Sequence, residues 1–455
     1  MRQSKTVSRR QFLQGSAAAA GGLALAGVPA NLAFGQGSDG FRVGLIGCGG
    51  RGTDAAKNCV EAAAQANIKL KIVALADAFG DRLKGAMAAL NALGKERADL
   101  TDERCFTGLD AYQKLLATDV NLVILATPPG FRPIHFEAAI QAGKNVFMEK
   151  PVAVDFAGFH SVVATSELAA EKKLAVVSGT QRRHESRYLE TMKRILDGAI
   201  GEIVSAQCYW NQGGLWVRKR EPGWSDVQWQ LRNWLYFTWL SGDHIVEQHV
   251  HNIDVINWAM GSIPTKVTSM GGRQYRTGPE YGHIYDHFCT EFEYASGCRT
   301  ISMCRQIDGA QERVSERVAG TKGASDCAGT IWDYQNNVVW KYEGPNANPY
   351  VLEHVDLLKS ILAGTPLNEG KRIAESTVCS IMARSSAYAG MAFNTDWALK
   401  KVQMDLMPKN LTMDSALPVA PVARPGQYKL EAGPDDRKDD KKDGKKDGKK
   451  GKNKA

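Results

Sequence analysis

The chain has 455 residues, of which 44% are hydrophobic and 23% charged, and its formal net charge is +8. Two domains are expected, because one hydrophobic core rarely serves so long a chain. The positive charge lies at the ends: residues 1–36 carry four Lys/Arg and no acid, and residues 435–455 carry ten Lys/Arg and six Asp. The body between them is neutral, so bulk charge predicts no nucleic-acid or membrane-surface partner.

The first 36 residues have the pattern of an export signal. Arg9-Arg10 precede Phe12-Leu13, and an apolar Ala/Gly-rich run and then small residues follow. This order is typical of twin-arginine signals, and a short membrane anchor is the alternative. We expect export by the twin-arginine route to the periplasm or cell envelope. No stable membrane span is expected after export, because no later stretch is long and apolar enough.

Nine cysteines are scattered without a C-x-x-C pair. Twin-arginine substrates fold before export in a reducing compartment, so buried free thiols are expected rather than disulfides.

Residues 401–434 contain several prolines and are predicted to be a linker. Residues 435–455 consist almost entirely of Lys, Asp and Gly. Such a tail cannot offset its ordering entropy, and we expect it to be disordered.

A glycine turn follows the first apolar run of the body. Residues 41–46 (FRVGLI) are predicted to be a buried strand, GCGGRG comes next, and residues 53–66 favour a helix. Gly47, Gly49 and Gly52 match the dinucleotide-binding pattern G-x-G-x-x-G. Its glycines allow a tight turn, close approach of a pyrophosphate and close helix packing. The start of the helix offers free N–H groups to the phosphates.

Asp77 ends a second buried run, residues 71–77 (KIVALAD). An acid near this position binds a ribose 2′-hydroxyl and repels a 2′-phosphate. NAD is therefore favoured as the cofactor, and Arg82 close by keeps NADP open as a second option. The alternative role for Asp77 is to cap the next helix.

The pattern of alternating elements continues through the first half. Buried strands are predicted over 121–129, 145–151 and 174–179, and helices over 131–144 and 155–173. This alternation predicts a doubly wound parallel sheet, whose ligands bind at the carboxyl ends of the strands. Lys150 lies at such an end and is followed by proline, so we expect its side chain to enter the crevice. A surface lysine is the alternative.

The most polar stretch of the second half is GDHIVEQHVHNIDVINW, residues 242–258. Treated as one helix over residues 245–260, at about 100° per residue, it places Glu247, His251, Asp254 and Trp258 on one face. His249 falls on the opposite, apolar face, which argues against a metal cage. His251 is a candidate base, since an imidazole suits proton transfer near neutral pH. The alternative is a hydrogen-bonded polar face that seals an interface.

Alternating apolar residues predict an antiparallel sheet with one covered face in the second half. Strands are expected over 202–210, 266–272, 286–294 and 299–307, and helices over 350–364 and 372–390. Seven of the ten tryptophans fall within residues 210–258. They suit either a sugar-stacking subsite or a core. Arg182 and Arg183 contact substrate or cofactor, or have structural roles.

The motifs GCGGRG, ATPPGFRPIHFEAAIQAGKNVFMEKP and HVHNID together resemble those of the Gfo/Idh/MocA family of nicotinamide-dependent oxidoreductases, over residues 40–395. The resemblance implies an α/β fold with an N-terminal Rossmann domain, assigned to residues 40–180. It also implies a C-terminal α/β domain with a large open antiparallel sheet, assigned to residues 181–400. That second domain is expected to bind substrate and to form homodimers or homotetramers.

The resemblance also implies site residues. Lys150 is expected to be catalytic and to bind substrate. The family's pattern of acid, three residues, His, two residues, Asp matches Glu247, His251 and Asp254, with Glu where Asp is usual. The residues expected at the cofactor are Gly47, Cys48, Gly49, Gly50, Arg51, Gly52, Asp77, Thr127, Pro128, His135, Glu149 and Lys150. No metal is expected.

These patterns predict hydride transfer between a tightly held NAD and a hydroxyl or keto group of a sugar, polyol or glycoside. An exported enzyme meets no ready pool of free nicotinamide cofactor, which favours redox-neutral cycles. One alternative is an NAD-dependent glycoside-cleaving cycle of oxidation, elimination, hydration and re-reduction. Another is a carbohydrate-binding protein that keeps the fold without turnover.

Overall fold

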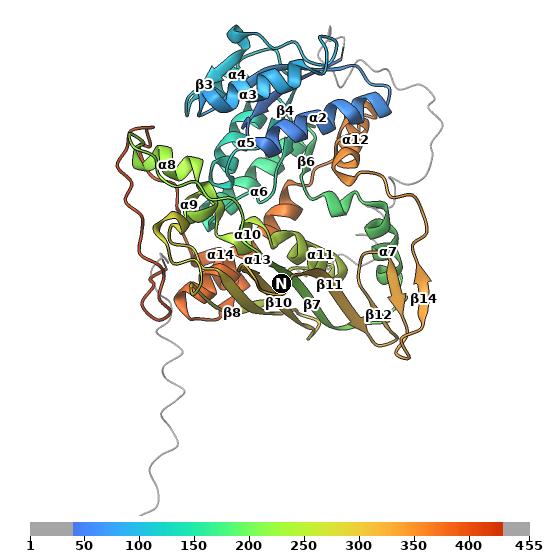
Figure 1. The fold of residues 1–455 in the computed structure, drawn as a ribbon. Coiled ribbons are helices and arrows are strands. Elements are labelled where there is room, and N and C mark those ends of the chain that lie inside the picture. Colours follow the sequence, from blue (N-terminus) through green and yellow to red (C-terminus); the bar gives the residue numbers. More distant parts are fainter. Residues whose placement is uncertain (1–39, 431–455) are drawn as a thin grey trace, which may run out of the picture. The chain divides into compact units, whose positions relative to one another are not determined.

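The computed structural model describes residues 40–430, so the predicted export signal (1–36) and tail (435–455) lie outside the described residues. The first half of the described chain forms a six-stranded sheet of parallel strands (Figure 1). The strands are β1 (Phe41–Ile46), β2 (Leu70–Asp77), β3 (Cys105–Thr107), β4 (Leu122–Leu125), β5 (Asn145–Met148) and β6 (Val176–Ser178). The predicted Rossmann sheet is confirmed. The sequence did not reveal β3, because its three residues are only partly buried or exposed.

The order across this sheet is β3-β2-β1-β4-β5-β6, so the winding reverses between β1 and β4. Ligands bind at such a reversal, beside the carboxyl ends of the strands. The helices between these strands are α2 (Gly50–Gln65), α3 (Gly80–Asn91), α4 (Ala111–Leu116), α5 (Arg132–Gln141) and α6 (Phe156–Glu171), with short 3-10 turns η1 (Asp102–Arg104) and η2 (Pro129–Phe131).

The second half of the chain forms a mostly antiparallel nine-stranded sheet with the order β14-β13-β12-β11-β7-β10-β9-β8-β15. Its strands are β7 (Ile203–Gln212), β8 (Lys266–Gly272), β9 (His287–Glu293), β10 (Arg299–Gln306), β11 (Arg313–Gly320), β12 (Ala324–Ser325), β13 (Thr330–Trp332), β14 (Val338–Lys341) and β15 (Phe393–Asn394). The expected large antiparallel sheet is confirmed. One pair departs from it, because β7 lies between β10 and β11 and runs parallel to β10.

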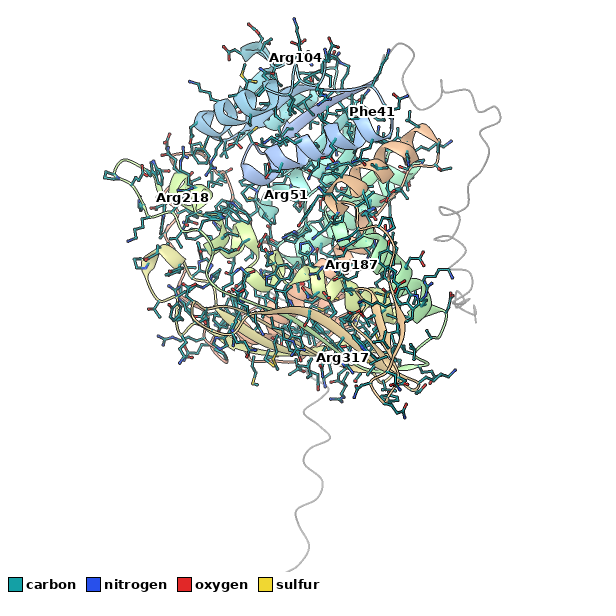
Figure 2. The ribbon with its side chains drawn as sticks, turned by 45° about the vertical axis from the view of Figure 1, so that its right-hand side comes forward. Phe41, Arg51, Arg104, Arg187, Arg218 and Arg317 are labelled. Atoms are coloured by element: carbon teal, nitrogen blue, oxygen red, sulfur yellow. The ribbon has the colours of Figure 1, made fainter. Side chains whose placement is uncertain are left out.

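Helices cover one face of the second sheet (Figure 1). The helical elements are η3 (Gln181–Arg183), α7 (Ser186–Leu196), α8 (Asp226–Arg232), η4 (Trp234–Tyr236), α9 (Thr238–Ser241), α10 (His244–Glu247), α11 (Val250–Met260), η5 (Pro279–Tyr281), α12 (Pro349–Leu362), α13 (Gly370–Ala389) and α14 (Thr395–Lys401). Phe288, Phe292 and Tyr294 are buried on the covered face, as their alternation predicts. The other face exposes charged side chains such as Arg317 (Figure 2).

Two late segments return to earlier parts of the fold. Helix α12 packs against α2, so the second half of the chain reaches the glycine turn of the first sheet. After α14 the chain runs without helix or strand through the described part of the predicted linker, but this segment is not a loose connection. Its apolar side chains, including Leu406, Leu411, Met413 and Leu417, pack against the aromatic core around α8 and α9. Their spacing along an irregular backbone gives no periodic signal, so the sequence did not predict this packing.

No helix among residues 40–430 is both long and apolar enough to span a bilayer. The nine cysteines are free thiols and most of them are buried, as predicted.

Asp155 joins α6 to this late segment. Its carboxylate accepts hydrogen bonds from the N–H of Gly158, in the first turn of α6, and from the N–H of Leu406, both at 2.7 Å. Replacing Asp155 with alanine removes a helix cap and leaves a second N–H without its partner. We expect Asp155→Ala to lower the free energy of unfolding by about 2 kcal/mol in denaturant titrations.

The matched control is Asp110→Ala, which removes an exposed carboxylate that pairs with Lys114 on the same helix. Its cost is expected to be under about 0.5 kcal/mol. Equal losses in the two variants would contradict the role given to Asp155.

Candidate active site

The predicted cofactor residues gather at the carboxyl edge of the first sheet. Strand β1 leads into the glycine turn, β2 ends at Asp77, β4 leads to Thr127, and β5 leads to Glu149 and Lys150. Because neighbouring strands are parallel, these ends lie at one edge.

The glycine turn leaves room for a ligand where its motif requires it. Gly47 has φ +101°, and a Cβ there would lie 2.5 Å from the carbonyl carbon of Ala126. A Cβ on Gly52 would lie 1.9 Å from the carbonyl oxygen of Gly47, so neither position admits a side chain. Gly49 and Gly50 instead have open space beside them at the start of α2. A pyrophosphate can therefore approach the free N–H groups of that helix.

Asp77 is held in the turn but keeps acceptor capacity. Its carboxylate accepts hydrogen bonds from the N–H groups of Cys48 (2.7 Å) and Phe79 (2.8 Å). Burial raises its pKa, and these two hydrogen bonds oppose that shift. Helix α3 begins at Gly80 without a side-chain cap, so Asp77 does not cap it directly. Each carboxylate oxygen retains a lone pair for a ribose hydroxyl.

A cavity of about 380 Å³ lies along this edge. The predicted residues that line it are Gly47, Gly49, Gly50, Arg51, Gly52, Asp77, Thr127, Pro128 and His135. Cys48 lines an adjoining cavity of about 770 Å³, while Glu149 and Lys150 line neither. The first cavity is also lined by Arg218, Leu231 and Arg232, which sequence reasoning missed, and by Trp216 and Trp234 from the tryptophan cluster noted in the sequence. The turn, the acid and the cavity together fit a dinucleotide.

His135 supports the cavity wall. Its Nδ1 lies 3.1 Å from the hydroxyl of Thr127, and its ring lies between those of Tyr112 and Phe131. Burial, reinforced by the nearby charge of Arg132, lowers the pKa of His135 to about 3. The ring is therefore neutral at ordinary pH, and it holds Thr127 by a hydrogen bond.

Arg51 connects the glycine turn to two carboxylates. Its Nε donates to Glu149 at 2.6 Å and its Nη2 to Glu353 at 3.3 Å, while its guanidinium lies 4.9 Å from the ring centre of Tyr350. Glu353 lies on α12 and is wholly buried, and burial raises the pKa of its carboxyl well above the usual value. This network fixes Glu149, the neighbour of Lys150. Nothing in the local sequence of α12 signals it.

Lys150 reaches the second half of the chain. Its Nζ donates to the main-chain oxygen of Glu247 at 2.5 Å and to the Glu247 carboxylate at 3.0 Å. Both side chains are about 11% exposed. Lys150 and Glu247, which were predicted as separate site residues, are thus brought together across the two sheets, and the carboxylate compensates the ammonium charge.

The single helix predicted over residues 245–260 is wrong. The structure has two helices, α10 and α11, interrupted at Gln248 and His249. The interruption lets the main-chain oxygen of Glu247 face Lys150 instead of continuing the helical ladder. His249 does lie on the predicted apolar side: it is fully buried, with its Nε2 2.7 Å from the hydroxyl of Ser302.

Asp243 sets the start of α10. It adopts φ +76°, an uncommon conformation for a residue with a side chain. Its buried carboxylate accepts hydrogen bonds from the N–H of His244 (2.6 Å), the N–H of Tyr285 (2.9 Å) and the hydroxyl of Tyr388 (2.6 Å). These bonds offset the strain and fix the direction in which α10 presents Glu247.

His251 lies beside Trp210 and several cations. The two rings stack with centroids 5.7 Å apart. Burial lowers the pKa of His251 well below the ordinary imidazole value, and the charges of Lys150, Arg182 and Arg51 add to this shift. No hydrogen bond joins its ring to another residue of the described chain. The imidazole is therefore neutral and able to accept a proton.

Asp254 is committed to ion pairs. Its carboxylate accepts from Arg183 Nε at 2.7 Å, from the Ser376 hydroxyl at 2.8 Å and from Arg372 at 3.4 Å. Burial opposes its ionised form, but the two arginines hold its pKa below the usual range. Arg183 also lies 4.3 Å above the ring of Trp258. These contacts fasten α11 to η3 and α13, so Asp254 anchors the helix that carries His251.

Besides Trp258, which contacts Arg183, the clustered tryptophans separate into three groups. Trp210 lies beside His251 and under Arg182, which pairs with Glu316. Trp216, Trp224 and Trp234 line the two cavities over the glycine turn. Trp229 and Trp239 belong to the aromatic core around α8 and α9.

Within residues 40–430, no group of three or more His, Cys, Asp or Glu could hold a metal ion.

Three family models match the sequence. One described as "Oxidoreductase family, NAD-binding Rossmann fold" matches residues 41–180, and the GFO/IDH/MocA C-terminal domain matches residues 188–325. The twin-arginine translocation signal matches residues 6–26, so the chain carries that export signal, as predicted.

Individual relatives agree with these matches. An Escherichia coli 2,7-anhydro-N-acetylneuraminate hydratase is 31% identical over 39% of this chain, a match that spans less than half (44%) of that relative. A Rhizobium meliloti inositol 2-dehydrogenase is 27% identical over 62% of this chain and 74% of its own. The crystal structure of an oxidoreductase domain protein from Kribbella flavida has the same fold, with TM-score 0.61, 20% identity, and coverage of 78% of this chain and 98% of that one.

The two sheets and the glycine turn agree with these matches. The chain belongs to the Gfo/Idh/MocA family of NAD-binding oxidoreductases.

Proposed function

We propose that the protein transfers a hydride between a tightly held nicotinamide dinucleotide and a hydroxyl or keto group of a sugar, polyol or glycoside. The observation that carries this proposal is the contact of Lys150 with Glu247, close to the dinucleotide cavity. Arg51 lines that cavity and binds Glu149, the residue next to Lys150. A substrate placed at the ammonium group therefore lies near the cofactor.

The cofactor supplies hydride chemistry when bound, and the residues of the chain position it. The N–H groups at the start of α2 would bind the pyrophosphate, and Asp77 would accept hydrogen bonds from a ribose. Thr127 and Pro128 would line the space next to these groups, with His135 holding Thr127. NAD is the cofactor expected from the family, and NADP is the second candidate cofactor.

Lys150, His251 and Glu247 would share the proton and charge chemistry. The neutral imidazole of His251 accepts the proton of the substrate hydroxyl. The ammonium of Lys150 donates a hydrogen bond to the same oxygen as negative charge develops on it. Glu247 pairs with the Lys150 ammonium and directs it, and Asp254 is a positioning residue that fixes α11. Trp210 offers an aromatic face to a sugar ring beside His251.

The net reaction has a second candidate. Two relatives are named as hydratases of an anhydro-sugar, one of them 28% identical and from Mediterraneibacter gnavus. A hydratase within an oxidoreductase family supports a cycle in which transient oxidation permits elimination and hydration before re-reduction. Such a cycle consumes no cofactor, which suits a protein sent to the periplasm or cell envelope. A carbohydrate-binding protein without turnover is disfavoured by the presence of both Lys150 and His251.

Self-association through the second sheet is part of the proposal. Its uncovered face exposes Met270 (73%) and Met303 (37%) among charged residues, so a homodimer or homotetramer would bury it.

Substitution of Lys150 by alanine removes the hydrogen bond to the developing charge. We expect turnover to fall roughly 10²- to 10³-fold with bound dinucleotide retained. The assay is reduction of bound cofactor by a panel of polyols and glycosides, followed by product analysis. Lys193→Ala, at an exposed helical ion pair, is the control and keeps full activity. Full activity in Lys150→Ala would remove the mechanism.

Glu247→Gln tests the ion pair separately. The amide still accepts a hydrogen bond but no longer compensates the ammonium charge, so we expect roughly a tenfold loss of kcat/KM. A loss as large as that in Lys150→Ala would instead give Glu247 its own contact with substrate.

The pH dependence follows from the surroundings of His251. Its pKa is lowered, so the neutral base persists as pH falls through about 6.5, the ordinary imidazole value. In the oxidation direction, kcat/KM should therefore fall only at a pH below about 6.5. A limb that appears at or above 6.5 in wild type, and is absent in His251→Gln, would contradict the burial and charge argument.

A further inference from the structure

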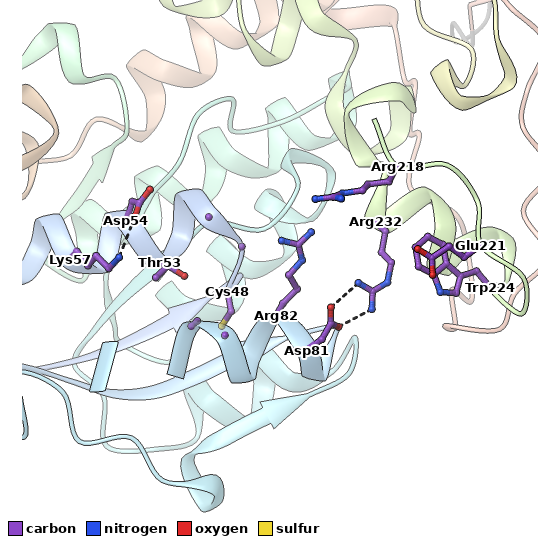
Figure 3. Close-up of a pocket in the computed structure, with 14 residues that line it drawn as sticks. Cys48, Thr53, Asp54, Lys57, Asp81, Arg82, Arg218, Glu221, Trp224 and Arg232 are labelled. Carbon is purple, nitrogen blue, oxygen red and sulfur yellow. Dashed lines mark hydrogen bonds and ion pairs between the residues drawn. The ribbon is translucent and has the colours of Figure 1, made fainter. Parts of the chain in front are cut away.

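The two cavities at the glycine turn have a second side that comes from outside the Rossmann sheet. Figure 3 shows the larger one, with α2 and α3 on one side and Arg218, Glu221, Trp224 and Arg232 on the other. The smaller cavity adds Trp216 and Trp234 from the same segment. These residues lie beyond the range matched by the NAD-binding family model, which ends at residue 180.

We propose that residues 215–234, the outer wall, form a second half of the dinucleotide site and slow release of the cofactor. The proposal rests on the proposed function, since it assigns the outer wall to the same cofactor. Its ligand is the phosphate-bearing adenosine portion of the dinucleotide, because the wall faces Asp77 and Phe79 at the end of β2 and Arg82 on α3.

The outer wall is fixed in place from behind. The hydroxyl of Tyr236 donates to the main-chain oxygen of Trp216 at 3.0 Å. Arg218 donates its N–H to the side chain of Asn233 at 2.8 Å, and the indole of Trp229 donates to the Arg218 carbonyl at 2.9 Å. The wall therefore needs little ordering when a ligand binds, which favours tight binding.

The late segment after α14 holds the wall from its other side. Ser225 donates to the main-chain oxygen of Met413 at 2.5 Å, and Gln230 to that of Leu417 at 2.6 Å. The N–H of Leu417 donates in turn to Asp226 at 2.9 Å. This explains why an irregular segment packs so closely: it is the support of the outer wall.

Arg232 and Asp81 fasten the wall to the Rossmann half. The guanidinium donates two hydrogen bonds to the carboxylate, at 2.7 and 3.0 Å. It also lies 4.0 Å above the ring of Phe79 and 5.2 Å from that of Trp224. Arg232 lines both cavities and Asp81 lines the larger one, so this pair joins the outer wall to the Rossmann half beside the cavities (Figure 3). The pair therefore restrains the outer wall against the Rossmann half, and its loss should ease release of a bound dinucleotide.

Two further cations face the cavities and keep their hydrogen-bond donors free. Arg82 on α3 and Arg218 on the wall line both cavities, and their side chains extend into the larger one (Figure 3). Neither guanidinium makes an ion pair or hydrogen bond to another residue of the described chain. The charge of Arg82 acts on the carboxylates of Asp77 and Asp81, but both guanidinium groups keep their hydrogen-bond donors for an added anion. A phosphate group supplies that anion, either the pyrophosphate of any dinucleotide or the 2′-phosphate of NADP.

The test is the release rate of cofactor from the full-length protein. The protein is loaded with NADH, and an excess of NAD is then added. The loss of the fluorescence of bound NADH gives the release rate. Arg232→Ala removes the ion pair and the ring contacts, so we expect release roughly 5- to 30-fold faster. Asp81→Asn removes the charge alone, and we expect roughly a threefold effect. The double variant should release no faster than Arg232→Ala, because both changes break one interaction.

Arg194→Ala is the matched control. Arg194 lies on α7, pairs with Glu190 and lies 4.2 Å from the ring centre of Trp340, so it has the same kinds of contact as Arg232 but lines neither cavity. The release rate of this variant should equal that of wild type. Unchanged release in both Arg232→Ala and Asp81→Asn, or an equal increase in Arg194→Ala, would overturn the proposal.

Equilibrium binding of NADH and NADPH to Arg82→Ala and Arg218→Ala tests the phosphate contact. Equal weakening of both nucleotides assigns the two arginines to the pyrophosphate, and greater weakening of NADPH assigns them to a 2′-phosphate. Unchanged affinity for both would overturn this contact. Failure of the wild-type protein to bind either nucleotide would instead reject the proposed function, so the two failures are distinguishable.

Discussion

The contact between Lys150 and Glu247 is the constraint on which the rest of the site depends. A lysine ammonium that is mostly withdrawn from water requires a compensating charge, and Glu247 provides it from the other half of the chain. The pair therefore fixes where α10 lies relative to the end of β5. The strained turn at Asp243 and the interruption before α11 follow from presenting both the carboxylate and the carbonyl of Glu247 to one amine.

Burial and neighbouring charges divide the polar residues into those poised for chemistry and those that hold the frame. His251 is buried near three cations, which keeps its imidazole neutral and able to accept a proton. Asp254, three residues later, is saturated by Arg183 and Arg372, which keeps it ionised and fixed. Sequence spacing alone assigns both to one face and makes them equal candidates. Their different surroundings separate the proposed base, His251, from the anchor, Asp254.

The parts of the fold that could be predicted are those whose signal is local. Gly47 and Gly52 could be recognised because they form a short motif between a strand and a helix. Lys150 could be recognised because it directly follows a predicted strand. Glu353 and Arg232 could not be found this way, because each meets its partner only after the chain has returned over a long distance to the first sheet. The prediction of one helix over residues 245–260 was wrong for a related reason, because a tertiary contact outweighed the local helical pattern. The catalytic and cofactor roles inferred from the sequence remain predictions.

The most direct test is a crystal structure of the protein with bound dinucleotide and a polyol. The account predicts a nicotinamide ring beside Lys150 and His251, with the substrate hydroxyl between these two side chains and the adenosine end under the outer wall. A nicotinamide ring that lies away from Lys150, or a substrate hydroxyl out of reach of His251, would contradict it.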